Sequence, residues 1–160
     1  MSAHTFHPPL VRHGTPAGVS PLVLIADDEP HARITLEFLI GRAGRARMLS
    51  VDSGIEALDL ALELRPQLCI LDVVMPDLDG YTICRTLRCE AADAAGMTIW
   101  LISGRRSAVD ADQARTVGAD RFIGKPFDPD LLVADVEHLL RRCRTSLPEP
   151  ATLQCPPHRV

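Results

Sequence analysis

The stretch that decides the fold of this chain is LCILDVVMPDLDG, residues 68–80. A short apolar run ends on one acid, Asp72, and then breaks into a turn that contains proline and glycine. Continuous apolar runs of this length are typical of strands buried on both faces of a parallel sheet. Three other apolar runs end on polar residues in the same way: residues 22–26 on Asp27 and Asp28, residues 98–102 on Ser103, and residues 121–124 on Lys125. The sequence therefore predicts that acids, a hydroxyl and an amine meet at one edge of a sheet.

The composition is that of a globular protein of one domain. Its 160 residues are enough to bury a core. Hydrophobic residues make up 46% of the chain and charged residues 24%, and this composition excludes a disordered chain. No run approaches the roughly 20 apolar residues of a membrane span, and the first 21 residues lack the apolar segment of a signal peptide. We therefore expect a cytoplasmic protein with no membrane contact.

Charge and cysteine usage exclude two further classes. The formal net charge of −4 leaves no basic footprint for direct nucleic-acid binding. Five cysteines at irregular spacing, with no C-x-x-C pair, argue against a disulfide framework and against a zinc site.

Between two proline-rich ends, apolar runs alternate with segments of helical period. We expect flexible extensions at residues 1–20 and 144–160, and one domain at residues 21–143. The predicted strands are 22–26, 47–51, 68–71, 97–102 and 120–123, and helices fill the gaps. The first helix opens near Pro30 and stops at Gly41 and Gly44, Ser53 caps the second, and the last follows Pro129. This alternation predicts an α/β fold with a parallel sheet. No nucleotide-binding glycine motif is present.

The residue types at the strand ends favour phosphoryl chemistry. Clustered carboxylates repel one another unless a cation joins them, and an oxygen-only ligand set without histidine or cysteine suits Mg²⁺. A lysine balances phosphate charge and a hydroxyl donates to a phosphate oxygen. With no histidine or cysteine nucleophile at these strand ends, a carboxylate is the natural phosphoryl acceptor.

Four ordered motifs resemble a known family. They are ADDEP at 26–30, LDVVMPDLDG at 71–80, LISG at 101–104 and GADRFIGKPF at 118–127. Together they look like the receiver domain of two-component response regulators, over about residues 21–143. The resemblance implies a five-stranded, doubly wound, flavodoxin-like sheet of order 2-1-3-4-5 with helices on both faces. Because only some 17 residues follow the last predicted helix, we expect a receiver of the stand-alone type.

The resemblance also assigns the acidic residues. Asp72 would be the phosphoacceptor, which takes phosphoryl from the phosphohistidine of a sensor histidine kinase or a phosphotransfer protein. Asp28, Asp72 and the backbone carbonyl of Val74 would bind Mg²⁺, and Asp27 would complete the pocket directly or through water. The chain would then be a regulator rather than an enzyme, with only its own phosphorylation and dephosphorylation as chemistry.

The remaining family positions concern the response to phosphate. Lys125 would pair with the phosphoryl group, Ser103 would hydrogen-bond it, and Phe122 would be the switch aromatic that turns inward. The bond between Lys125 and Pro126 is one that this family often holds cis. The added charge of about −2 would shift a population of conformers. The shift would be read out on the last two helices and the strand between them, and the chain would then bind a partner or relay the phosphoryl group. The charges at Asp120, Arg121, Asp135 and Glu137 fit either a homodimer through those helices or a solvated surface.

Competing interpretations stay open at this point. Asp27 and Asp28 could cap a helix, Ser103 could be a turn serine, and Phe122 could be ordinary core. Asp77 and Asp79 are interpreted as caps and left out of the site.

Whole-protein alternatives are an interaction domain of receiver fold that is never phosphorylated, and a hydrolase that works through an aspartyl phosphate. The hydrolase would need an acid where Val74 stands. The same apolar Val74 predicts slow loss of phosphate, because nothing there orients the attacking water. The role of Arg105 and Arg106 is open.

Overall fold

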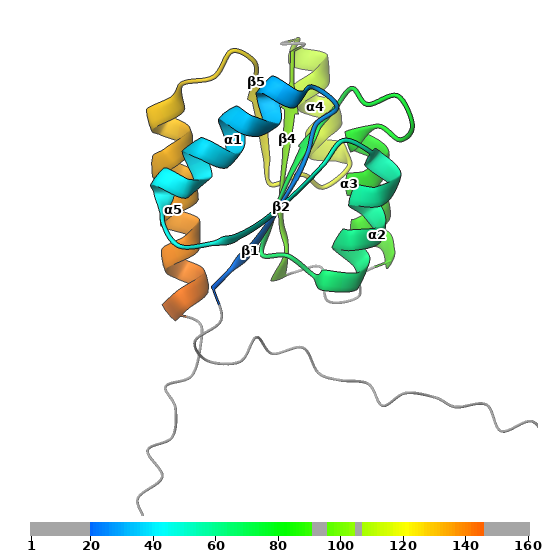
Figure 1. Cartoon of the computed structure of the whole chain (residues 1–160). Helices are drawn as coiled ribbons and strands as arrows, with labels where there is room; N and C mark the ends of the chain where they lie inside the picture. Colours follow the sequence, from blue (N-terminus) through cyan, green and yellow to red (C-terminus); the bar gives the residue numbers. More distant parts are fainter. Residues whose placement is uncertain (1–19, 91–95, 105–106, 146–160) are drawn as a thin grey trace, which may run out of the picture.

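The computed structural model describes residues 20–90, 96–104 and 107–145 of the chain (Figure 1). The extensions predicted at residues 1–20 and 144–160 lie outside these ranges, apart from Ser20 and the end of the last helix. Arg105 and Arg106 lie outside them as well.

Five parallel strands form one sheet. They are β1 (Leu22–Ala26), β2 (Arg47–Val51), β3 (Leu68–Asp72), β4 (Thr98–Ser103) and β5 (Arg121–Gly124). Their order is β2-β1-β3-β4-β5, which confirms the predicted flavodoxin-like sheet. The last three strands begin or end one residue later than predicted, so the strands themselves include Asp72 and Ser103. Asp72 is in register with Ile102, and Ser103 with Gly124, so the polar ends of these strands are level.

Helices follow each strand. They are α1 (Pro30–Ala43), α2 (Gly54–Leu64), α3 (Gly80–Glu90), α4 (Ala108–Thr116) and α5 (Pro129–Thr145). Pro30 stands in the first turn of α1, and the Ser53 hydroxyl caps α2 by accepting from the amide of Glu56. The prediction that Gly41 stops α1 is wrong. Gly41 lies inside the helix, where an exposed glycine costs only about 1 kcal/mol, and the chain leaves the helix at Gly44 with φ 145°.

The helices cover both faces of the sheet. Figure 1 shows α1 and α5 on one face and α2, α3 and α4 on the other. Successive side chains of a strand point to opposite faces, so β3 sends Cys69 and Leu71 into the core with α2 and α3, while Leu68 and Ile70 pack with α1 and α5. Trp100 is buried in the second of these cores, as predicted for a packing residue. This two-sided burial leaves the loops at the carboxyl ends of the strands as the place for polar chemistry.

Charges on β5 and α5 pair within the chain. Arg121 forms an ion pair with Asp135 and stacks on the Trp100 ring at 5.3 Å. Arg88 of α3 pairs with Asp120 at 2.6 Å.

Within the described residues, no helix is long and apolar enough to cross a membrane.

Candidate functional site

The polar strand ends converge at one edge of the sheet, as the sequence predicted. Asp72 ends β3, Ser103 ends β4, and Asp27 and Asp28 directly follow β1. Asp27 is 1% exposed, Asp72 6% and Ser103 fully buried, whereas Asp28 is exposed. Buried acids in an otherwise apolar sheet require compensating charge or hydrogen bonds.

The three aspartates form a cluster that fits a hard cation. One carboxylate oxygen from each of Asp27, Asp28 and Asp72 lies within 4.8 Å of the others. An all-oxygen set with one exposed member matches the preference of Mg²⁺, which keeps several waters and takes only a few carboxylates. The predicted acidic ligands therefore come together in space.

Lys125 supplies the positive charge in this cluster. Its Nζ donates to Asp27 Oδ2 at 2.7 Å and to Asp72 Oδ1 at 2.8 Å. It is the only lysine in the sequence. Burial acts to lower the pKa of Lys125, but the hydrogen bonds with Asp27 and Asp72 outweigh it, so its pKa lies above the ordinary value. The ammonium is therefore held charged between two buried carboxylates.

Asp72 has a raised pKa despite this partner. Burial is the main cause, and the hydrogen bond and the charge of Lys125 offset it only in part. The nearby Asp27 carboxylate raises the pKa further. The second oxygen, Oδ2, accepts from the backbone amide of Val74 at 2.8 Å. An added cation beside Asp72 would therefore lower its pKa, because more positive charge stabilises the ionised carboxylate.

An arginine that the sequence did not single out holds the loop between β1 and α1. Arg33 donates from Nη1 to the backbone carbonyl of Asp27 at 2.6 Å and lies 3.9 Å from an Asp52 carboxylate oxygen. The amide of Glu29 donates to Asp27 Oδ1 at 3.0 Å. An arginine in the second turn of a helix carries no sequence signal for such a contact.

Asp77 and Asp79 are caps, as predicted, but of two different helices. Asp79 accepts from the amide of Thr82 at 2.9 Å and from its hydroxyl at 2.8 Å, at the start of α3. Asp77 reaches instead to α2, where it accepts from Ser53 Oγ and from the amides of Gly54 and Ile55. The Ser53 hydroxyl and these amides hold the pKa of Asp77 below its usual range.

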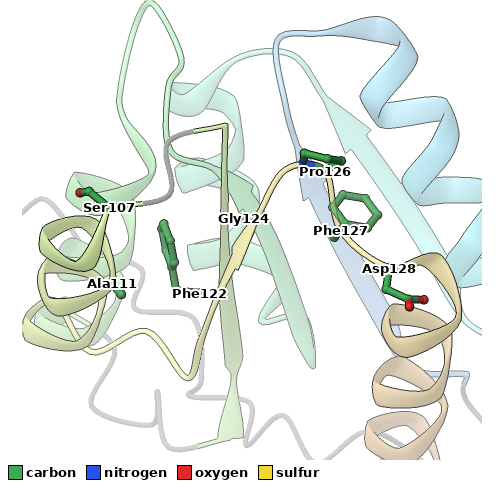
Figure 2. Close-up of a pocket in the computed structure, with 7 residues that line it drawn as sticks. All are labelled: Ser107, Ala111, Phe122, Gly124, Pro126, Phe127 and Asp128. Carbon is green, nitrogen blue, oxygen red and sulfur yellow. The ribbon is translucent and has the colours of Figure 1, made fainter.

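Phe122 borders a surface groove beside the site (Figure 2). The groove has a volume of about 510 Å³, and its lining residues are Ser107, Ala111, Phe122, Gly124, Pro126, Phe127 and Asp128. Phe122 is half-buried, and its ring lies between α4 and β5. The bond between Lys125 and Pro126 is cis, as predicted, and the Lys125 amide donates to the Ser103 carbonyl at 2.7 Å. The switch role of Phe122 and Ser103 stays a prediction.

Comparison with known proteins gives consistent matches. The model of the response regulator receiver domain family matches residues 23–137. The transcriptional regulatory protein GltR of Pseudomonas aeruginosa is 35% identical over 122 residues, which are 76% of this chain and 50% of GltR. The DNA-binding response regulator MtrA of Mycolicibacterium smegmatis is 33% identical over 120 residues, which are 75% of this chain and 50% of MtrA. The chain thus spans about half the length of the curated relatives it matches.

Solved structures match over the same region. A putative response regulator from Chloroflexus aurantiacus is 30% identical with a TM-score of 0.68, over 76% of this chain and 98% of that one. The chemotaxis protein CheY4 of Vibrio cholerae is 25% identical with a TM-score of 0.67, over 76% of this chain and 99% of that one.

Proposed function

Because this chain belongs to the response regulator receiver domain family, a family of phosphorylation-dependent signalling domains, we propose that Asp72 is the residue that accepts the phosphoryl group. The observation that carries the proposal is the position of Lys125, whose ammonium bridges Asp72 and Asp27 within 2.8 Å. A cation so placed can also neutralise a phosphoryl group attached to the same carboxylate.

The proposed donor is the phosphohistidine of a sensor histidine kinase or of a phosphotransfer protein. A carboxylate oxygen of Asp72 attacks phosphorus, a P–O bond forms, and the P–N bond to the imidazole breaks. The electron pair of that bond returns to the imidazole nitrogen, which takes up a proton. The product is an acyl phosphate on Asp72, and no oxidant or reductant is involved.

Asp28, Asp72 and the backbone carbonyl of Val74 would hold Mg²⁺, and Asp27 would contribute directly or through water. When bound, the ion stabilises negative charge on the phosphoryl oxygens. The close approach of three carboxylates supports this assignment, because their mutual repulsion is relieved by a second cation beside Lys125.

The proposed response to phosphorylation starts at Ser103 and Lys125. Lys125 stays paired with the phosphoryl group, and the Ser103 hydroxyl moves to donate to a phosphoryl oxygen. Ser103 is fully buried, so its movement must displace neighbours, and Phe122 fills the space. The resulting change would be read out on α4, β5 and α5, by a protein partner or by a second copy of the chain. The active conformer needs several kcal/mol of differential interaction to dominate.

Three broader hypotheses belong to this proposal. The domain acts as a regulator whose only chemistry is on its own Asp72, it works in the cytoplasm, and it does not itself contact nucleic acid. Relatives described as DNA-binding are twice as long as the matched region, so their output is not carried over to this domain. That the receiver acts without an attached output domain stays a prediction, which the mass of the native protein isolated from cells would test. The interaction domain that is never phosphorylated lacks support, because the acids, the hydroxyl and the lysine are all in place.

The decisive experiment is incubation with Mg²⁺ and acetyl phosphate, followed by intact-mass measurement. We expect one added phosphoryl group on the wild type and none on Asp72→Asn. Asp79→Asn is the matched control, since it changes a carboxylate of the same loop that caps α3, and it should be phosphorylated normally. An unmodified wild type, or phosphoryl that persists on Asp72→Asn, would overturn the proposal.

A further inference from the structure

The loop between β3 and α3 is fastened to α2 by the carboxylate of Asp77. Asp77 Oδ2 accepts from Ser53 Oγ at 2.6 Å and from the Ile55 amide at 3.1 Å. Asp77 Oδ1 accepts from the Gly54 amide at 2.9 Å and from the amide of Leu78 at 2.9 Å. Amides at the start of a helix lack partners within the helix. A carboxylate from a distant loop therefore satisfies the first turn of α2.

A close backbone contact joins the same two segments. A Cβ atom at Gly54 would lie 2.1 Å from the Leu78 carbonyl oxygen, a distance that no side chain tolerates. Gly54 is buried. The contact is independent of the Asp77 hydrogen bonds, and it shows that the loop rests directly on the first residue of α2.

The fastened loop is the one that surrounds Asp72. At its beginning, the Val74 amide donates to Asp72 Oδ2 at 2.8 Å. At its end, the Gly80 amide donates to the Val73 carbonyl at 3.1 Å, and a Cβ at Gly80 would lie 2.5 Å from the Asp72 carbonyl oxygen. Asp77 sits between these two anchors. Asp77 therefore belongs to the same short loop as the amide that hydrogen-bonds the acceptor.

Val51 at the end of β2 contacts the loop that carries the other two acids, and Asp52 reaches the same loop through Arg33 of α1. Asp52 lies 3.9 Å from Arg33, whose guanidinium donates to the Asp27 carbonyl, and the Asp27 amide donates to the Val51 carbonyl at 3.2 Å. Thus residues 51–55, which provide none of the proposed site residues, make hydrogen bonds with both loops that do.

We propose that Asp77 is a positioning residue for the cation and phosphoryl site, and that the start of α2 is the fixed support against which it sets the loop 73–79. The inference rests on the proposed function of Asp72. A loop that must be ordered when Mg²⁺ binds costs conformational entropy at that moment, whereas a loop held beforehand does not. Releasing Asp77 therefore weakens Mg²⁺ binding, although Asp77 is not a ligand.

The test compares Asp77→Ala, Asp77→Asn and Asp79→Ala. Asp79→Ala is the matched control, because it removes a carboxylate cap from the same loop but leaves the contact with α2 in place. Mg²⁺ affinity is measured by calorimetry in the absence of any phosphodonor, at a temperature where thermal unfolding shows that each variant is folded. We expect Asp77→Ala to bind Mg²⁺ about tenfold more weakly. Asp77→Asn keeps one acceptor oxygen and should fall between Asp77→Ala and the wild type, whereas Asp79→Ala should bind as the wild type does.

The phosphorylation rate gives a second readout. With acetyl phosphate, the Mg²⁺ concentration for half-maximal rate should rise in Asp77→Ala, while the rate at saturating Mg²⁺ recovers to the wild-type value. A purely structural cap would not separate these two quantities. Gly54→Ala pushes the same contact apart from the side of α2 and should act in the same direction, with Gly41→Ala, which meets nothing within 4 Å, as its control. Asp77→Asn, which keeps one acceptor oxygen, replaces Asp77→Ala if that variant does not fold.

The outcomes are distinguishable. If the wild type binds Mg²⁺ and is phosphorylated while Asp77→Ala and Gly54→Ala behave identically to it, the positioning role is wrong and the proposed function stands. Equal weakening in Asp79→Ala also overturns the positioning role, because contact with α2 would then be irrelevant. If the wild type neither binds Mg²⁺ nor accepts phosphoryl, the proposed function fails and the inference fails with it.

Discussion

Replacing Lys125 with methionine should destabilise the fold and make its stability depend on pH and Mg²⁺. Methionine keeps most of the apolar stem of lysine but removes the charge. The substitution takes away two short ion pairs at once, at 2.7 Å to Asp27 and 2.8 Å to Asp72. It leaves two carboxylates that are 1% and 7% exposed without their cation.

The magnitude follows from this burial. Removing one partner of a buried ion pair costs about 3–5 kcal/mol, because the other charge stays buried and unpaired. The Lys125 side chain is 23% exposed, so solvent screens part of the effect. We therefore expect a loss of about 3 kcal/mol in the free energy of unfolding at pH 7 without Mg²⁺. A domain with about 5–15 kcal/mol of stability would remain folded.

The pH dependence has a definite sign. Without the lysine, the already raised pKa of Asp72 rises further. The folded protein then binds a proton at pH values where the unfolded chain, with a pKa of 3.8 for this group, does not. Stability therefore increases as the pH falls from 7 towards 4. Part of the loss in Lys125→Met should be recovered at the lower pH, and Mg²⁺ should recover part of it at pH 7.

Urea unfolding at pH 7 and pH 4.5, each with EDTA or with Mg²⁺, measures these effects. Arg42→Met is the control, because the pair between Arg42 and Asp130 is 3.5 Å long with side chains 49% and 85% exposed. Its loss should be below about 1 kcal/mol. A Lys125→Met variant no less stable than this control, or one whose loss is the same under all four conditions, would refute the electrostatic reasoning.

Three further predictions follow from the described contacts. Asp72→Asn should be more stable than the wild type at pH 7 but not at pH 4. The raised pKa means that protonated Asp72 stabilises the fold below pH 3.8, and that this stabilisation is lost as the pH rises and Asp72 ionises. An equal difference in the free energy of unfolding at both pH values, measured in urea, contradicts this. Val74→Gln should shorten the lifetime of the phosphorylated protein by about tenfold, because a polar group can orient the attacking water. Intact mass, followed over time after removal of the donor, measures this lifetime. A half-life of seconds for the phosphorylated wild type would contradict the role given to Val74. Arg88→Met should lose about 2 kcal/mol with unchanged phosphorylation, since Arg88 donates to the carbonyls of Gly118 and Met97 and pairs with Asp120; a loss of phosphorylation in the folded variant contradicts it.

Local rules account for what the sequence could predict. The apolar runs, the cap at Ser53 and the proline at the start of α1 act within a few residues, and they located all ten elements to within a few residues. The rule that a glycine ends a helix fails at Gly41. Helix α1 continues through this residue because it packs against the sheet. Site residues were also predictable, because parallel strands bring their carboxyl ends to one edge. Asp72, Lys125 and the acid pair needed only that rule and the family resemblance.

The sequence by itself determined the chemistry of this protein: which acids, hydroxyl and amine stand at the strand ends, and in which order. Only the tertiary structure decided how they are paired. It buries Asp27 and exposes Asp28, sets the one lysine between two carboxylates 98 and 53 residues away, and sends Asp77 to cap a helix that begins 23 residues earlier. The physical reason is the distance along the chain over which each interaction acts. Helix and strand propensities and helix caps act only between neighbouring residues. Burial and hydrogen bonding depend instead on which distant segments the packed sheet brings into contact.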